Sequence, residues 1–364
     1  MLELIPPGTQ IDFIGHRRIA YAISASLLIA GIVAIAVQGM RFGIDFAGGT
    51  EVAVRFDTEG KADEGVIRTL AEACGVLDPT VVRYGETSAP EFLIRFNRVG
   101  PANEAECPLA PEEQQKLADV DHATREIATS PGTTAVIDRL TLAMKQHLGG
   151  LQILSIDYVG PQVGDDLRRD GLRSLGIATL AILGYIAYRF SSRFGPGAVV
   201  ALVHDVAITA GIFAIFQLEF DLSVLAALLG LMGYSLNDTV IVYDRIRENM
   251  SLHTKHNLVD VLNRSVNETL SRTLLTSLNT LATVLCLLFL GGEVIFGFAL
   301  AMVIGIVVGT YSSIFVAAPI LLFLEQRFGG AAGSGRSGDS RDAKASGKPG
   351  PSGGKKARAK TAAA

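Results

Sequence analysis

Long apolar stretches separated by short polar segments dominate the chain. Three of them carry no charged residue, namely Ile19–Val37, Thr273–Gly292 and Val294–Leu324. A helix needs about 20 residues to cross a bilayer. Each stretch is therefore predicted to be a transmembrane helix.

Three further apolar stretches contain or adjoin charge. Ser174–Tyr188 is flanked by Arg173 and Arg189, whose long side chains can reach the membrane surfaces. The chain is 49% hydrophobic and 19% charged, with a mean hydropathy of +0.37, which excludes an ordinary soluble domain. Six spans are predicted; the last two are Phe194–Leu218, which contains His204 and Asp205, and Leu222–Tyr243, which contains Asp238.

The distribution of basic residues predicts the orientation. With the N-terminus in the cytoplasm, the short outer loops 219–221 and 291–293 contain no lysine or arginine. Basic residues gather on the inner side instead, which predicts a multi-pass membrane protein with both termini cytoplasmic. The inner set is Arg17, Arg18, Arg189, Arg193, Arg245, Arg247, Lys255, Arg264 and Arg327. The net charge of -4 averages the two sides and does not indicate a nucleic acid partner.

Residues 1–18 form the predicted cytoplasmic N-terminal segment. Ile11, Phe13 and Ile14 are expected along the inner membrane surface, with an unstructured start as the alternative. The first span has 19 apolar residues, more than the usual 7 to 15 of a cleaved signal peptide. Residues 19–39 are therefore interpreted as a retained anchor.

The segment 40–170 between the first two spans reads as an outer α+β domain. Alternating and helical patterns follow each other as strand, helix, strand, strand, helix, strand, the order of a ferredoxin-like fold. Residues 101–132 interrupt it as a proline-rich insertion with one helix at most, Pro111–Thr129. The elements are Glu51–Phe56, Lys61–Cys74, Thr80–Tyr84, Phe92–Phe96, Thr134–Leu148 and Leu151–Val159.

Cys74 and Cys107 both fall in this outer domain. An oxidising compartment permits a disulfide between them, but the sequence does not fix their geometry, so paired and free states both stay open. Cys286 is interpreted as a packing residue of the fifth span. After the five-helix bundle, 171–326, residues 327–364 are rich in Gly, Ser, Ala and Lys and are predicted to form a disordered basic tail. The tail is expected to contact anionic lipid or ribosomal RNA, or to have no specific partner.

Two glycine-containing segments join the outer domain to the membrane. They read FGIDFAGGTEV from Phe42 and VGPQVGDDLRRDG from Val159. Glycines allow tight turns and Asp45 can cap one, so these segments are predicted to form a neck or hinge. Its residues are Gly43, Asp45, Gly48, Gly49, Gly160 and Pro161.

Charged groups inside the spans are the candidate site. A carboxylate at membrane depth costs about 2.5 to 3.5 kcal/mol, so one that persists needs a partner or a function. His204 and Asp205 are expected about 10 to 12 Å from the inner surface and Asp238 about 8 Å, which predicts that they share one layer. With Asn237 and Arg272 they form the candidate proton pathway. Asp244 is at the inner edge, where an ion pair with Arg245 and Arg247 explains it.

Polar residues of the fifth span form a stripe: Arg272, Thr276, Asn279 and Thr283 share one helix face. The stripe is predicted either to hydrogen-bond other helices or to line a hydrated path in which Arg272 is the countercharge to Asp238. Small residues recur every four positions in the sixth span and predict close helix packing, within the chain or with a partner. They are Gly297, Ala301, Gly305, Gly309 and Ser313.

Several of these segments together resemble the SecF family of protein-export membrane subunits, over roughly residues 10 to 325. They are FGIDFAGGT, VGPQVG, the HD pair of the third span, GYSLNDTVIVYDRIREN, SRTLLTS and GTYSS. The resemblance implies a non-enzymatic subunit that works with SecD, in some cases with YajC, on the SecYEG channel. It implies that the proton gradient, with no cofactor, drives movement of unfolded preproteins, with Asp238 as proton carrier and Arg272 as its partner.

Two other functions, small-molecule export and intramembrane hydrolysis, fit the sequence less well than protein export. A small-molecule exporter of the resistance-nodulation-division type has a similar membrane architecture, but an outer domain of about 130 residues is small for gripping a substrate. An intramembrane hydrolase needs a nucleophile beside a base, and the sequence identifies no serine or cysteine partner for His204 and Asp205. No catalytic residue or metal site is predicted.

Overall fold

The computed structural model describes most of the membrane-spanning and outer parts of the chain. The described residues are 6, 9–56, 62–84, 90–100, 107, 131–189, 194–252 and 257–328. The predicted helix Pro111–Thr129, nearly all of the insertion 101–132 and most of the tail 327–364 lie outside them. Residues up to Leu322 form one compact unit, and a second unit begins at Phe323.

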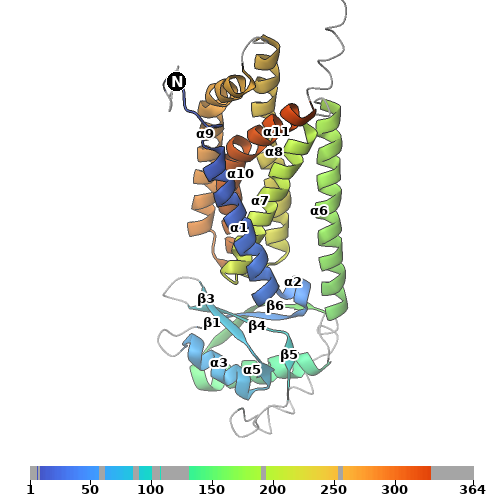
Figure 1. The fold of residues 1–364 in the computed structure, drawn as a ribbon. Helices are drawn as coiled ribbons and strands as arrows, with labels where there is room; N and C mark the ends of the chain where they lie inside the picture. The colour runs from blue at the N-terminus through green and yellow to red at the C-terminus, as the bar shows by residue number, and fades with distance from the viewer. Residues whose placement is uncertain are drawn as a thin grey trace, which may run out of the picture. The chain divides into compact units, whose positions relative to one another are not determined.

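Six helices among the described residues are long and apolar enough to cross a membrane, which confirms the predicted number of spans. They run side by side in Figure 1. The sixth span is α10 (Glu293–Ser312), followed by a π-helical turn (Ser313–Ala317) and α11 (Ala318–Phe328). The other five are α1 (Arg17–Gln38), α6 (Pro161–Arg189), α7 (Gly195–Ile215), α8 (Leu222–Leu252) and α9 (Leu258–Leu290).

Three helices extend well beyond the apolar stretches that predicted them. α6 starts at Pro161, so the charged half of the second neck segment is helical. α8 continues past Tyr243 to Leu252, and α9 starts 15 residues before Thr273. Hydropathy identifies only the part of a helix that suits lipid, whereas the backbone hydrogen bonds continue into polar sequence.

The outer domain has the predicted ferredoxin-like topology. Its four-stranded sheet has the order β3-β4-β1-β6, with all neighbours antiparallel. In Figure 1 the sheet lies between the membrane helices and the pair α3 and α5. The elements are β1 (Gly49–Phe56), α3 (Glu64–Ala73), β3 (Thr80–Tyr84), β4 (Glu91–Phe96), α5 (Pro131–Leu148) and β6 (Leu151–Val159).

Alternation along β1 divides the two faces of this sheet. Val52, Val54 and Phe56 are buried in one apolar core with residues of α3 and α5. Glu51 and Arg55 alternate with them and therefore lie on the other face. Three short elements were not predicted from the sequence. They are the strands β2 (Val76–Leu77) and β5 (Arg98–Val99), which pair with each other, and the one-turn helix α2 (Ile44–Ala47) inside the first neck segment.

A disulfide joins Cys74 and Cys107 inside that core, with their Cα atoms 5.2 Å apart. The structure thus decides a pairing that the sequence left open. Cys286 is free and exposed on α9, so its interpretation as a packing residue within this chain is wrong.

Small residues allow the closest helix contacts. A Cβ atom at Gly31 of α1 would lie 2.8 Å from the Cα of Gly211 on α7. On α10, a Cβ at Gly305 would lie 2.4 Å from Leu231, and one at Gly309 would lie 3.2 Å from Ser235, both on α8. The predicted small-residue ridge therefore packs α10 against α8 within this chain.

Candidate functional site

Asp238 lies in the middle of α8 and is 1% exposed. The Ser277 hydroxyl of α9 donates a hydrogen bond to its Oδ2 atom over 3.3 Å, and Thr310 of α10 donates to Ser277 over 2.8 Å. Thr273 is one turn before Ser277, and its buried hydroxyl has no hydrogen-bond partner among the described residues. The buried acid is therefore hydrogen-bonded to a hydroxyl of α9, which is itself hydrogen-bonded to a hydroxyl of α10.

Among the described residues, no guanidinium nitrogen of Arg272 lies within 4.0 Å of the Asp238 carboxylate. A role for Arg272 as the countercharge to Asp238 stays a prediction. Arg272 is exposed, as are Thr276, Asn279 and Thr283. Both threonine hydroxyls bond to carbonyls of their own helix. The polar stripe of α9 thus faces outward from this chain.

Asp205 of α7 is fully buried at the centre of a second hydrogen-bonded network. Ser235 of α8 and Ser312 of α10 donate to its Oδ2 atom over 2.5 and 2.7 Å. Its Oδ1 atom lies 2.9 Å from His204 Nδ1, and His204 Nε2 lies 3.0 Å from the Ser24 hydroxyl of α1. This network connects four transmembrane helices through one carboxylate.

The contacts of Ser24, His204 and Asp205 follow the order of a hydrolytic triad, and Ser24 is the serine that sequence reasoning missed. Ser24 is only 6% exposed, and its hydroxyl lies 3.2 Å from that of Tyr311. A nucleophile has to reach a bound substrate, whereas this hydroxyl is enclosed between helices. The arrangement therefore ties α1 to α7 and α10.

The two buried acids are neighbours through α8. Ser235, which bonds Asp205, precedes Asp238 by three residues, about 4.5 Å along the helix. On α10, Thr310 belongs to the Asp238 network and Ser312 to the Asp205 network. The predicted layer thus contains two neighbouring hydroxyl networks. The SRTLLTS and GTYSS segments supply Ser277, Thr310 and Ser312.

The surroundings of Asn237 and Asp244 differ from those expected from the sequence. Asn237 is exposed, on a different face of α8 from the buried Asp238. Asp244 pairs with Arg189 at the end of α6 over 3.4 Å, so the expected ion pair is present, but its partner is neither Arg245 nor Arg247. Arg245 instead contacts Glu248 and Glu268. Adjacent residues on a helix point in different directions, so closeness in sequence does not predict which side chains contact each other.

The neck residues are closely packed. Gly48 has φ +73, and a Cβ there would lie 3.0 Å from the Cα of Pro161, the first residue of α6. A Cβ at Gly164 would in turn lie 3.0 Å from the Gly48 nitrogen. Asp45 accepts a hydrogen bond from the Leu222 amide at the start of α8 over 3.0 Å, and Gly43 donates to the Phe220 carbonyl. A hinge role for the neck stays a prediction.

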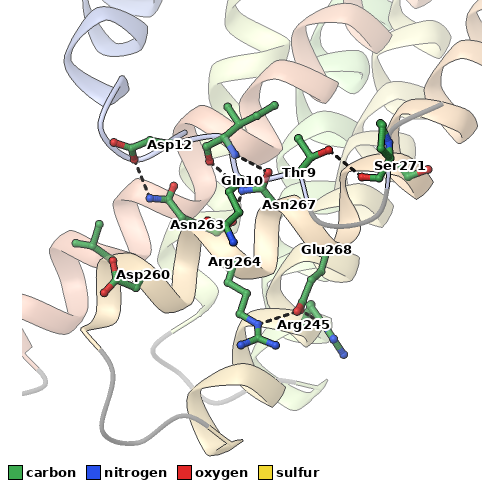
Figure 2. A pocket seen from close by; sticks show the side chains of 13 residues that line it. Thr9, Gln10, Asp12, Arg245, Asp260, Asn263, Arg264, Asn267, Glu268 and Ser271 are labelled. Atoms are coloured by element: carbon green, nitrogen blue, oxygen red, sulfur yellow. Dashed lines mark hydrogen bonds and ion pairs between the residues drawn. The ribbon is translucent and has the colours of Figure 1, made fainter. Parts of the chain in front are cut away.

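A polar cavity of about 1110 Å³ opens at the opposite end of the bundle (Figure 2). Its walls are α9, the end of α8 and an N-terminal strap, residues 9–16. Asn267 exchanges two 2.9 Å hydrogen bonds with the Ile11 backbone, and Asn263 accepts from the Ile14 amide. Phe13 and Ile14 are buried against the bundle, so the expectation that they lie along the lipid surface is wrong.

Asp12 fixes this strap to α9. The Asn263 side chain donates to its carboxylate over 2.7 Å, and the Gly15 amide donates over 2.8 Å. The bonds from Gly15 and then Asn263 lower the pKa of the Asp12 carboxyl below its ordinary value. No group of three or more His, Cys, Asp or Glu residues in the described part of the chain is placed to hold a metal ion.

Six membrane spans with two buried acids and a ferredoxin-like outer domain define a multi-pass membrane protein of the transport class. Two family models then match the chain. The model of the SecD/SecF C-terminal region covers residues 140–327, and that of the SecD/SecF GG motif covers residues 33–59, which include Gly48 and Gly49. The chain belongs to the SecD/SecF family of protein export membrane proteins.

Similar proteins from bacteria are named protein translocase subunit SecF. The Desulfurispirillum indicum protein is 40% identical over 87% of this chain and 93% of its own length. The Magnetococcus marinus protein is 41% identical over 89% and 95%, and the Pseudomonas aeruginosa protein 36% over 86% and 91%. Matches of this extent cover nearly the whole of each relative.

Two crystal structures of SecDF share the fold. SecDF of Thermus thermophilus, described as a translocon-associated membrane protein, is 33% identical with a TM-score of 0.66, and covers 88% of this chain. SecDF in a super-membrane-facing form is 32% identical with a TM-score of 0.61 over 92% of this chain. The chain spans only 39% and 41% of the length of those two chains.

Proposed function

We propose that this protein is the SecF subunit of a Sec protein-export machinery and uses the proton motive force, together with SecD, to move preproteins through SecYEG. The proposal rests on Asp238, a buried acid inside a membrane span whose carboxylate accepts a hydrogen bond from Ser277. A carboxylate at this depth is costly, so one that persists needs a partner or a function. It needs no cofactor, because the proton gradient supplies the energy.

When Asp238 binds a proton, its carboxylate loses the negative charge to which the Ser277 hydroxyl donates a hydrogen bond. The hydrogen bond from Ser277 and the attraction to Arg272 both weaken when the carboxylate becomes neutral, so the packing of α9 against α8 and α10 changes. The neighbouring Asp205 network, with His204, passes that change to α1 and α7. The shifted helices then move the outer domain through its neck.

SecD is the proposed partner for the outward face of α9. An exposed arginine and three exposed polar side chains are unfavourable against lipid, so the stripe from Arg272 to Thr283 favours a protein neighbour. The solved SecDF chains support this partner, because this chain matches about two fifths of their length. SecYEG, YajC, membrane lipid and an unfolded preprotein are the further proposed partners.

The proposed setting is the bacterial inner membrane, with both termini cytoplasmic and the disulfide-containing domain outside. The cavity of Figure 2 then opens to the cytoplasm beside the polar face of α9 up to Ser271. It offers water access from the inner side toward Arg272 and, beyond it, the hydroxyls around Asp238.

Replacement of Asp238 by asparagine tests the proposal. The amide keeps the shape but cannot exchange a proton, so D238N is expected to abolish gradient-driven export while SecD still copurifies. Asp244→Asn is the matched control, because Asp244 is exposed on the same helix. Export is measured in membrane vesicles with and without a proton gradient. Wild-type export by D238N would refute the proposal, and altered drug accumulation in its place would favour a small-molecule exporter.

A further inference from the structure

A chain of ion pairs crosses from the outer sheet to the loop between α7 and α8. Glu219 of that loop is paired with Arg95 of β4 and, over 3.2 Å, with Arg41. Arg95 is paired at the same time with Glu51, its cross-strand neighbour on β1. One guanidinium is therefore shared by a carboxylate of the sheet and a carboxylate of the membrane bundle.

These side chains are withdrawn from water. Arg95, Glu51 and Glu219 keep only 24%, 19% and 24% of their side-chain surface exposed. Burial raises the pKa of Glu51 despite the opposing charge of Arg95, and Glu219 and Glu51 raise the pKa of Arg95 although burial acts the other way. Removing one partner of a partly buried ion pair costs more free energy than removing one partner of an exposed pair, because the remaining charge is shielded from water.

Backbone and aromatic contacts hold the same joint. Phe42 and Phe220 form a parallel bridge in which Phe220 donates to the Arg41 carbonyl over 2.8 Å. The ring of Phe220 also contacts those of Phe46 and Phe213, at centroid distances of 6.0 and 6.4 Å. Asp45 caps α8 two residues further on. Neck, sheet and loop are thus joined at one place.

The loop is also the shortest connection between the two acid-bearing helices. α7 carries Asp205 and ends at Ile215, and α8 carries Asp238 and begins at Leu222. Asp238 is 16 residues along α8 from this joint, about 24 Å. A helix transmits a displacement along its axis because its backbone bonds are continuous, so a shift of α8 arrives at the loop.

We propose that Glu219 and Arg95 are positioning residues that make the outer sheet and the α7–α8 hairpin move as one body. The inference rests on the proposed export function and assigns the contact by which helix movement reaches the outer domain. In this proposal the chain does not bend between the outer sheet and the α7–α8 loop.

Glu219→Gln and Arg95→Lys are the test variants. The first removes the loop charge, and the second keeps the charge but lacks the planar fork of donors with which Arg95 holds both carboxylates. Each is expected to lower the gradient-dependent part of export about fivefold or more, the lower range of a typical coupling, with gradient-independent export and SecD copurification retained. A merely structural defect lowers both parts of export together.

Arg55→Gln provides the matched control. The Arg55–Glu91 pair joins the same two strands and is not among the contacts between the sheet and the loop. Gradient-dependent export by Glu219→Gln equal to that of Arg55→Gln would overturn the inference. Parallel measurement of D238N separates the two ideas: an inactive D238N with a normal Glu219→Gln rejects only the joint, whereas a normal D238N rejects the export mechanism.

A cross-link between positions 219 and 95 tests whether the contact between loop and sheet stays closed during export. With Glu219→Cys and Arg95→Cys in one chain, a bifunctional thiol reagent long enough to replace the two side chains, with the cross-link confirmed by mass, should restore the gradient-dependent export lost in the untreated double variant. Wild-type protein treated with the same reagent is the control for reaction at Cys286. Export blocked by the cross-link would show that the joint has to open and would refute movement as one body.

Discussion

Removal of the Cys74–Cys107 disulfide is the change whose magnitude follows most directly from the structure. The bond joins the end of α3 to the insertion over a sequence separation of 33 residues. In the chain-entropy treatment a loop of that length contributes about 3.7 kcal/mol at 25 °C, within the range of about 2 to 5 kcal/mol lost when native disulfides are removed. The variant carries Cys74→Ala and Cys107→Ala together.

The expected result is an outer domain that opens several hundred times more often, since every 1.4 kcal/mol is tenfold. The assay is proteolysis of the full chain in detergent along a urea series, with cleavage sites located by mass. Cys286→Ala is the control, because that thiol is free and exposed.

Alkylation gives an independent check on the same bond. The chain has three cysteines, so one thiol should react before reduction and three after it. A loss of stability below about 1 kcal/mol, or three reactive thiols in the untreated protein, would refute the reasoning.

Two further predictions concern packing and pH. Gly305→Ala should cost about 1 to 3 kcal/mol, because its Cβ would overlap Leu231; thermal unfolding in detergent measures this, and Gly176→Ala, where nothing lies within 4 Å, should not destabilise. The lowered pKa of Asp12 means that its hold on the strap is complete above the unfolded-state value of about 3.9 and is lost as the pH falls through the lower folded value. A spin label at Gln10 should therefore become mobile only in that acid range, and Asp12→Asn should remove the transition; mobility that changes near neutral pH would contradict it.

The large-scale architecture follows from local patterns of sequence. An uncharged stretch as long as Ile19–Val37 predicts a membrane-spanning helix by itself. In lipid the backbone N–H and C=O groups have no water to bond, and a helix pairs them within the same segment. Alternation in Glu51–Phe56 and helical spacing in Thr134–Leu148 are equally local, and their order was enough to identify the ferredoxin-like domain. The position of Asp238 within an apolar span likewise needed no tertiary information.

Only the tertiary structure decided which groups meet. Periodicity shows that Arg272 and Ser277 are on α9, but the rotation of that helix turns Ser277 toward Asp238 and Arg272 outward. Ser24 reaches His204 across 180 residues of sequence, and Glu219 reaches Arg95 across 124. A helix pattern fixes a face but not the neighbour that covers it, because neighbours are set by packing between segments distant in the chain. For that reason the sequence determined the spans, the outer domain and the acids, and the fold determined their partners.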